Sequence, residues 1–354
     1  MTEQNLTDAW CERVTRAAAT HTPLCIRGGN SKAFYGRTVE GETLDTRRHC
    51  GVLEYEPSEL VIRARAGTPL AEVEKLLDQQ QQMLAFEPPH FSPDSTLGGA
   101  VATGLSGSRR PFSGSARDAV LGVGLVNGKG ESLNFGGQVM KNVAGYDLSR
   151  LMAGALGTLG LLTDISLKVL PKPEKEYILK QVCTQPEALL RFSDWMAKPL
   201  PLSAACWHDD HLYLRLSGTE AGIRHAQHQL GDTMLEQDPS WWTRLRDHRL
   251  EFFQRNEPLW RLSVPPATPP LAIAGDWLID WAGGQRWLYS NESTDTIRHI
   301  AGSVGGHATL FRNTDHSGDI FHPLPTSLFK LQQRLKQAFD PAGILNPGRL
   351  YEDL

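Results

Sequence analysis

The chain has 354 residues, of which 40% are apolar and 21% charged, and 36 basic against 40 acidic side chains give a formal net charge of −4. This length predicts about two domains, each able to bury its own core, and the composition excludes a disordered chain. The near balance of charge disfavours a nucleic-acid coat or a polybasic membrane anchor, because both need a surplus of Lys and Arg. A basic patch on one face stays open.

Targeting and membrane signals are missing from the sequence. No apolar run reaches the roughly 18 residues needed to cross a bilayer, and the first residues lack the regions of a secretory signal. The cysteines are odd in number and form no CxxC pair, which disfavours a disulfide framework, a zinc ribbon and an iron–sulfur cluster. We therefore expect a cytoplasmic protein with reduced thiols.

The first half of the chain predicts an α+β domain of short strands. The pair Asn127-Gly128 predicts a hairpin between two of them, and Thr68 before Pro69 predicts the capped start of a helix. The expected helices cover residues 7–19 and 70–81, and the expected strands cover residues 24–27, 51–55, 60–65, 120–126, 131–135 and 160–171.

The second half predicts an antiparallel sheet with helices on one face, because strands and helices alternate along it. Strands are expected at 177–183, 203–207, 212–216, 259–264, 277–281, 286–289 and 308–311, and helices at 186–197, 219–230, 293–304 and 326–339. A charged, proline-rich stretch at 171–176 suits a crossing between domains. The predicted division is 1–173, 174–322 and a C-terminal helix and tail at 323–354. Eight of the nine tryptophans lie in this half, where core packing, an interface and an active-site lining all stay open.

Glycine-rich segments carry the chemical signal. The first, Gly28-Gly29-Asn30-Ser31-Lys32, directly follows a strand, and consecutive glycines there can expose backbone N–H groups to a phosphate. It is neither a Walker A loop nor a GxGxxG fingerprint, and a tight structural turn is the competing interpretation.

Two further segments follow, TLGGAVATGLSG from Thr96 and KNVAGYDLSRL from Lys141, the latter continued by GALGTLG from Gly154. Small residues let a flat or anionic body approach the backbone, although a tightly packed helix would also explain Ala100 and Ala102. This order of one phosphate loop and two later small-residue segments favours a ligand with a pyrophosphate and two ring systems.

The ordered segments RGGNSKA, EPPH, TLGGAVATGLSG, SGSARDAVLG, KNVAGYDLSRL and GTLGLLTDISLKVLPKP resemble the FAD-binding domain of the vanillyl-alcohol-oxidase (PCMH) type over residues 1–173. The tail FDPAGILNPGRLY from Phe339 is similar to that of FAD-linked 2-hydroxyacid oxidoreductases. Through GGHATLF, the whole chain resembles FAD-binding subunits of bacterial glycolate oxidases, also called glycolate dehydrogenases. The resemblance implies a two-subdomain FAD-binding domain followed by a smaller antiparallel-sheet cap.

The resemblance also implies which residues hold FAD. The residues implied around the pyrophosphate are Gly28, Gly29, Asn30, Ser31 and Lys32; along the flavin and ribityl chain Thr96, Gly98, Gly99, Ala102 and Gly104; on the far side of the cofactor Gly157, Thr158, Gly160 and Ile165; and over the isoalloxazine Asn346 and Arg349. Some relatives tether the flavin through a His or Cys. The first loop has no His, so we expect non-covalent FAD, with His90 as the one candidate tether.

Metal binding is not expected. Oxidising 2-hydroxy-acid members of the family often carry a His-Gly-Asp-Gly-Asn-x-His run, and this chain has none. Its nearest sets are His208-Asp209-Asp210-His211, where Asp-Asp predicts a hairpin turn, and His225 with His228 on a polar helix. Turn residues and a solvated face are the favoured interpretations.

If the chain oxidises substrate itself, a base and a carboxylate clamp are required near the flavin. His307, which follows two glycines, is the candidate base, and Arg110, with Arg109 and Arg117 near it in sequence, is the candidate clamp. Arginines that neutralise FAD phosphates and a turn histidine are the alternative.

For partners, the resemblance implies a homologous FAD-binding catalytic subunit and an iron–sulfur subunit that passes electrons to a quinone. Glycolate is then the substrate of the complex, which contacts the inner face of the membrane through those partners, and nucleic acid is not a partner. Two other functions stay open: a self-sufficient FAD oxidoreductase for another 2-hydroxy acid or a sugar, and a scaffold with a decayed flavin pocket.

Overall fold

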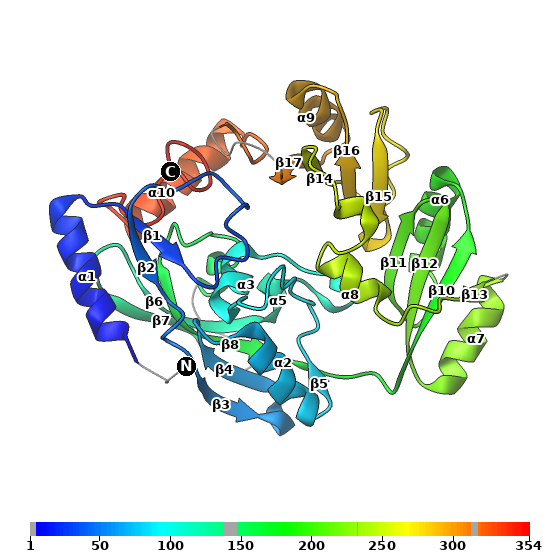
Figure 1. Ribbon diagram of the computed structural model, residues 1–354, viewed down its shortest axis with the longest axis horizontal. Helices are drawn as coiled ribbons and strands as arrows, with labels where there is room; N and C mark the ends of the chain where they lie inside the picture. Colours follow the sequence, from blue (N-terminus) through cyan, green and yellow to red (C-terminus); the bar gives the residue numbers. More distant parts are fainter. Residues whose placement is uncertain (1–4, 138–146, 232, 313–317) are drawn as a thin grey trace. The chain divides into compact units, whose positions relative to one another are not determined.

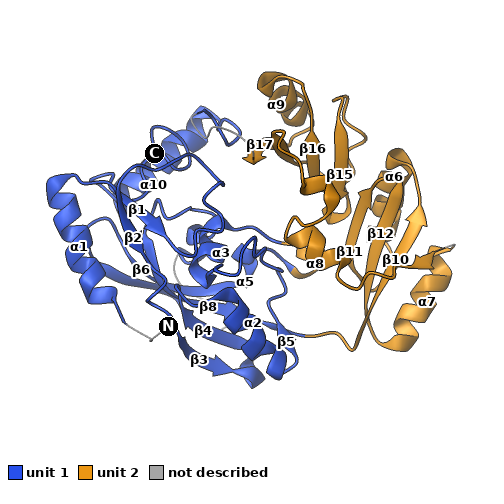
Figure 2. Ribbon diagram, viewed as in Figure 1, with its two compact units in different colours: residues 1–106, 114–171, 316–354 blue, residues 107–113, 172–315 orange. Residues whose placement is uncertain are grey.

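A five-stranded and an eight-stranded antiparallel sheet organise the chain in the computed structural model, which describes residues 5–137, 147–231, 233–312 and 318–354 (Figure 1). The chain divides into two units (Figure 2). Unit 1 comprises Met1–Ser106, Gly114–Pro171 and His316–Leu354, and unit 2 comprises Gly107–Ser113 and Lys172–Asp315. The chain therefore passes between the units four times, and the short return at 107–113 has no signal in the composition.

Unit 1 is built on the five-stranded sheet β3-β4-β8-β6-β7. Its strands are β3 (Val52–Glu56), β4 (Val61–Arg65), β8 (Leu161–Lys168), β6 (Val120–Val126) and β7 (Ser132–Gly136). The helices α2 (Leu70–Gln79) and α3 (Leu97–Thr103) bury Leu70, Val73 and Val101 in the same core as Ile62 and Ile165 of the sheet. Smaller elements are η1 (Pro57–Glu59), β5 (Gln82–Met83), α5 (Ala116–Ala119), η2 (Arg150–Met152) and β9 (Leu170–Pro171), which pairs with β5.

A parallel pair, β1 (Leu24–Arg27) and β2 (Glu42–Asp45), forms a second layer of unit 1. Helix α1 (Thr7–Thr20) packs Trp10 and Val14 into the core beneath this pair. The C-terminal helix α10 (Thr326–Phe339) leads into a tail that lies parallel to β1, with Leu24 N donating to Ile344 O at 2.7 Å and Asn346 N donating to Leu24 O at 3.0 Å. The first and last parts of the sequence therefore share one hydrogen-bonded layer.

Unit 2 contains the eight-stranded sheet β13-β10-β12-β11-β15-β16-β14-β17, in which every printed strand pair is antiparallel. Its strands are β10 (Lys175–Val182), β11 (Leu202–His208), β12 (His211–Gly218), β13 (Met234–Leu235), β14 (Leu259–Ser263), β15 (Asp276–Asp280), β16 (Gln285–Tyr289) and β17 (His307–Arg312). Its helices are α4 (Arg110–Ser113), α6 (Gln185–Met196), α7 (Glu220–Leu230), α8 (Trp241–Arg246), η3 (Glu251–Phe253), η4 (Trp281–Gly283) and α9 (Thr294–Ser303).

The longer helices α6, α7 and α9 bury their apolar sides against one face of this sheet, as predicted. The opposite face is covered by aromatic residues of the α8–η3 region. Tyr213, which alternates with the core residues Leu212 and Leu214, stacks on Trp241 with ring centroids 3.9 Å apart. Of the eight tryptophans in this half, all but Trp277 are buried, so the core alternative holds for the others.

Most expected elements agree with the structure to within two residues, among them the hairpin of β6 and β7 around Asn127. The predicted cap of α2 is wrong: the Thr68 hydroxyl donates to Arg65 O at 2.7 Å, and the helix begins after Pro69 without a side-chain cap. Strand β2 and helix α8 were not predicted. The TLGG segment forms α3, so the packed-helix alternative describes its backbone.

Candidate functional site

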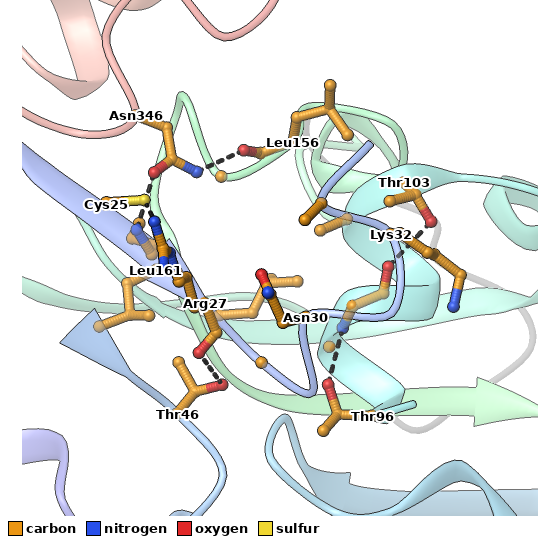
Figure 3. Close-up of a pocket in the computed structure, with 18 of the residues that line it drawn as sticks. Cys25, Arg27, Asn30, Lys32, Thr46, Thr96, Thr103, Leu156, Leu161 and Asn346 are labelled. Atoms are coloured by element: carbon orange, nitrogen blue, oxygen red, sulfur yellow. Dashed lines mark hydrogen bonds between the residues drawn. The ribbon is translucent and has the colours of Figure 1, made fainter. Parts of the chain in front are cut away.

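A cavity of about 300 Å³ lies in unit 1, where four segments far apart in the sequence meet (Figure 3). Its walls come from β1 and the loop after it, from α3, from residues 156–162, and from the C-terminal tail. The lining residues that were predicted to bind a cofactor are Gly28, Gly29, Asn30, Ser31, Lys32, Thr96, Gly98, Gly99, Ala102, Gly157, Gly160, Asn346 and Arg349. Thirteen of the sixteen predicted cofactor residues thus surround one cavity.

The loop after β1 presents unpaired backbone amides to this cavity. The N–H groups of Gly28, Gly29, Asn30 and Ser31 have no acceptor within the described part of the chain. Asn30 has a φ of 58°, so the chain there switches to the left-handed conformation that makes a concave nest of amides. Such a nest binds anionic oxygens.

Close packing requires glycine in this loop. A Cβ on Gly29 would lie 1.5 Å from Asp94 O, and one on Gly28 would lie 2.5 Å from the Thr96 hydroxyl oxygen. The loop is therefore pressed against the segment that leads into α3, and a larger residue would displace its amides.

Helix α3 supplies a wall of small residues. The Thr96 hydroxyl caps the helix by accepting from Gly99 N at 3.2 Å. Gly98 packs against Ala66, where a Cβ would lie 2.8 Å from the Ala66 Cβ, and its amide donates to Ala66 O at 2.7 Å. Because Gly98, Gly99 and Ala102 carry little or no side chain, a ligand can approach the helix backbone closely.

The tail closes the cavity through Asn346. Its side-chain oxygen accepts from Ile26 N at 2.8 Å, and its amide nitrogen donates to Leu156 O at 2.7 Å, as Figure 3 shows. Asn346 thereby ties β1 to the turn that carries Gly157, where a φ of 74° favours glycine.

The charge of the lining is positive. Arg27, Lys32 and Arg349 line the cavity, and none of its other described lining residues is Asp or Glu. Lys32 is 7% exposed, and its ammonium lies 3.4 Å from the Ser31 hydroxyl oxygen and 5.7 Å from the centre of the Phe91 ring. The cavity therefore fits an anionic ligand, and the nest of amides fits a phosphate or pyrophosphate.

Arg349 lines the cavity and also contacts the first loop. Its guanidinium donates to Arg37 O at 2.8 Å and to Ala33 O at 3.0 Å, so it fixes the backbone that follows the first loop. Burial lowers the pKa of Arg349, and these carbonyl acceptors offset part of the loss of hydration.

Three predicted cofactor residues lie outside the lining. Gly104 ends α3 with a φ of 62°, the buried Thr158 hydroxyl donates to Ala155 O at 2.7 Å, and Ile165 is fully buried in the sheet core. Their predicted contacts with a cofactor stay predictions.

The predicted catalytic residues belong to unit 2. His307 is the exposed first residue of β17, and Arg110 begins α4 with its guanidinium 4.2 Å from the centre of the Trp281 ring. The neighbouring Arg109 is 5% exposed and forms an ion pair with Glu176, so it is held by the protein itself. Burial alone would raise the pKa of Glu176, but the charges of Arg215 and Arg109 hold it below its usual range. The roles of His307 and Arg110 stay predictions.

Other sequence features fall away from the cavity. Residues 141–146 of the KNVAGYDLSRL segment lie outside the described residues. Asp209 and Asp210 both have a φ of 50° and form the predicted turn between β11 and β12. His208 ends β11 and His211 begins β12, so the two histidines flank this turn. Among the residues that the structure describes, no group of three or more His, Cys, Asp or Glu side chains could hold a metal ion.

Some lining residues were not predicted, notably Arg27, Thr46 and Thr103. Arg27 directly precedes the glycine pair, and a cation beside a phosphate loop is a signal that could have identified it. Thr46 reaches the site only through the parallel pairing of β2 with β1, with Thr46 N donating to Arg27 O at 2.9 Å. No local pattern announces that pairing.

Comparison with protein families and relatives agrees with this geometry. Residues 7–136 match the model of the FAD binding domain family, and residues 325–350 match that of the C-terminal domain of FAD linked oxidases. The chain is 47% identical over 352 residues to glycolate oxidase subunit GlcE of Escherichia coli (strain K12), covering 99% of each chain. It is 30% identical over 177 residues to glycolate oxidase subunit GlcD of Bacillus subtilis (strain 168), covering 49% of this chain and 37% of that protein.

Solved structures share the fold at low sequence identity. A p-cresol methylhydroxylase with substrate bound matches with a TM-score of 0.71 and 13% identity, over 99% of this chain and 88% of that chain. An alkyldihydroxyacetonephosphate synthase matches with a TM-score of 0.66 and 16% identity, over 96% of this chain and 74% of that chain. The predicted α+β architecture of the PCMH type is confirmed.

Proposed function

The chain belongs to the family of glycolate oxidase subunit GlcE, and from this we propose that it is the FAD-binding subunit of a glycolate oxidase that converts glycolate to glyoxylate. FAD is bound in the cavity of unit 1 without a covalent bond. Electrons then leave through partner subunits for a quinone-type acceptor.

The observation that carries this proposal is the combination of four unpaired amides, three cations and no carboxylate around one cavity. The pyrophosphate of FAD is the part that such a lining fits best. The N–H groups of residues 28–31 donate hydrogen bonds to it, while Lys32 and Arg27 balance its charge. Gly98, Gly99 and Ala102 leave room beside α3 for the remainder of the cofactor.

Non-covalent binding is supported by the side chains of the lining, which include no His. The candidate tether His90 does not line the cavity, and its Nε2 lies 3.0 Å from a Glu74 carboxylate oxygen. The lining thiol, Cys25, is 7% exposed and accepts from Arg27 Nε at 3.2 Å. The residues present therefore fit FAD held by hydrogen bonds and charge.

Bound FAD supplies a two-electron acceptor for the hydride of a 2-hydroxy acid. The residues of unit 1 bind and orient it, and the fully buried apolar residues behind the cavity exclude water. We place the base and the carboxylate clamp for glycolate in a homologous FAD-binding subunit, while His307 and Arg110 are the candidates if this chain reacts with substrate itself. An iron–sulfur subunit completes the route for electrons.

We also propose that the subunit is cytoplasmic and contacts the membrane only through its partners. None of the helices among the described residues has the length and hydropathy to cross a bilayer. Quinone lies in the membrane, so a partner has to reach it.

The decisive experiment is purification of the chain followed by acid precipitation. We expect a yellow protein whose flavin is released into the supernatant with one FAD per chain. Flavin that stays in the pellet would show a covalent bond and overturn that part of the proposal, and a chain that neither carries nor takes up FAD would overturn the function.

A second assay separates the partner-dependent enzyme from a self-sufficient one. The chain alone should not reduce a dye acceptor when glycolate is added, whereas co-expression with its two proposed partner subunits should restore the reduction. Rapid turnover by the chain alone would contradict the partner-dependent enzyme and favour His307 and Arg110 as its catalytic residues.

A further inference from the structure

A buried ion pair lies at the junction of α10 and the tail. Lys336 is 9% exposed and its ammonium donates three hydrogen bonds: to Thr158 O at 2.9 Å, to Leu345 O at 2.7 Å and to an Asp340 carboxylate oxygen at 2.7 Å. Asp340 is 1% exposed and also accepts from Ile344 N at 3.1 Å and from Leu345 N at 2.7 Å. From α10, this lysine thus holds two separate pieces of backbone, the turn at Thr158 and the tail at Leu345.

These pieces are the supports of two cavity walls. Thr158 follows Gly157 in the turn of residues 155–158, and Leu345 precedes Asn346 in the tail. Neither Lys336 nor Asp340 lines the cavity, so neither is a direct ligand. The backbone of Leu345 is held on one side by Lys336 and Asp340, and its neighbours Ile344 and Asn346 pair with Leu24 of β1 on the other.

We propose that Lys336 and Asp340 are positioning residues for the cofactor: they fix the 155–158 turn and the 344–349 tail at the separation that FAD requires. This inference rests on the proposed function of unit 1. It goes beyond that function because it assigns the affinity of the site to a pair that never touches the ligand.

The chemistry of the pair supports positioning over simple packing. Burying an ammonium and a carboxylate costs free energy, which an apolar pair would avoid, so a buried pair favours one geometry more than it favours stability. Here the ammonium has a full set of acceptors and the carboxylate receives two backbone N–H groups besides. Burial also lowers the pKa of Lys336, and Asp340 opposes that change.

The pair also explains why Asn346 can bridge two walls. The Asn346 backbone has a φ of 41°, a conformation that asparagine tolerates but that needs support from its neighbours. With Leu345 fixed by two hydrogen bonds to this pair, the Asn346 side chain reaches Ile26 N and Leu156 O together. Loosening the pair should therefore separate these walls before it unfolds the unit.

The test uses the full chain, stripped of flavin and titrated with FAD at a temperature where every variant is folded. Lys336→Met keeps much of the side-chain length and removes the charge and the donors. We expect its FAD Kd to rise about tenfold or more, because the turn and the tail are no longer held together by the ammonium. A tenfold rise corresponds to a loss of about 1.4 kcal/mol of binding free energy. Asp340→Asn, which keeps the shape and removes the charge, should raise the Kd by a smaller factor.

Two controls separate positioning from loss of stability. Val73→Ala removes a fully buried methyl pair on α2, away from the cavity, and should lower the unfolding temperature with an FAD Kd within about twofold of the unmodified chain. Lys330→Met removes an exposed lysine from the same helix as Lys336 and should change neither quantity.

The outcomes are distinct. If Lys336→Met and Val73→Ala have the same FAD Kd at a similar loss of stability, the pair contributes only to stability and the positioning role is wrong. If Lys336→Met does not fold, Asp340→Asn decides in the same way. An unmodified chain that binds no FAD overturns the proposed function itself, whereas normal binding by all variants overturns only the positioning role.

Discussion

The loop after β1 in unit 1 and the aromatic face of the unit 2 sheet differ in what their residues contact. The loop leaves four consecutive amides without a partner beside a cavity. The aromatic face closes on itself: His248 stacks on Phe253 with ring centroids 3.8 Å apart, and Trp287 lies 4.8 Å from Phe311. A row of unpaired amides beside a cavity favours a ligand, whereas closely packed buried rings stabilise the fold.

This difference predicts how each region responds to mutation. A larger residue in the loop should cost ligand binding before it costs folding, because the amides would be displaced. A smaller residue in the aromatic cluster should cost folding, because the rings are buried and would leave a cavity. The predictions below test this contrast, beginning with the largest effect.

Trp287→Ala should destabilise the chain by about 3–5 kcal/mol, since Trp287 is 4% exposed and contacts His248, Phe253 and Phe311. Urea unfolding followed by circular dichroism measures the loss. Trp277→Ala is the matched control, because Trp277 is only half-buried and should cost less. Equal losses at the two positions would contradict the assignment of the cluster as a stabilising core.

Gly29→Ala should weaken FAD binding about 100-fold, equivalent to about 2.7 kcal/mol. The added Cβ would lie 1.5 Å from Asp94 O, so the loop has to move and its amides with it. Flavin titration measures the effect. Gly318→Ala, where a Cβ meets nothing within 4 Å, is the control and should bind FAD normally. Unchanged affinity in Gly29→Ala would show that the nest does not hold the cofactor.

The buried His248 should make the chain less stable in acid. Burial, with the nearby charges of Arg312 and Arg261, holds the pKa of His248 well below 6.5. Below about pH 6.5 the unfolded chain therefore binds a proton at His248 that the folded chain does not bind. As the pH is lowered, the free energy of unfolding decreases by up to about 1.4 kcal/mol per pH unit until the folded-state pKa is reached.

Unfolding of the unmodified chain and of His248→Phe at several pH values isolates this contribution. The slope attributable to His248 should vanish in the variant, although the lowered pKa of the part-buried His208 leaves a remainder. His225→Gln, which changes an exposed histidine on α7, should keep the full slope. Identical slopes in His248→Phe and the unmodified chain would mean that His248 is protonated in the folded state.

The sequence predicts the long periodic elements well because their signals are local. Helix α10 has the predicted bounds, and so does β6, whose apolar run ends in an Asn-Gly turn. Strand β2 was missed because its four residues are held by pairing with β1 and carry little pattern of their own. The return of residues 107–113 to unit 2 depends on contacts such as Ser108 with Asp280, 2.8 Å apart and 172 positions away in sequence.

For the site too, local signals were predictive and long-range contacts were not. The glycines of the first loop predicted its place in the cavity because their conformational freedom is a property of the sequence itself. Ile165 and Thr158 were expected beside the cofactor, yet the structure directs Ile165 into the core and uses the Thr158 carbonyl to hold Lys336. Nearness in sequence to a glycine-rich turn does not specify which way a side chain faces.

Arg27→Met gives the smallest effect and tests a residue that sequence patterns overlooked. The Arg27 guanidinium lines the cavity and its one hydrogen bond in the described residues goes to the Cys25 sulfur, so its charge is available to a ligand. Removing that charge should raise the FAD Kd about five- to tenfold, roughly 1 kcal/mol, as expected for an exposed charge near a phosphate. The salt dependence of FAD binding should also decrease, because added salt screens the attraction that Arg27 supplies. Arg16→Met, on the exposed side of α1, should alter neither the Kd nor its salt dependence, and an Arg27→Met variant that behaves like it would leave Lys32 and the amides as the only groups that hold the anion.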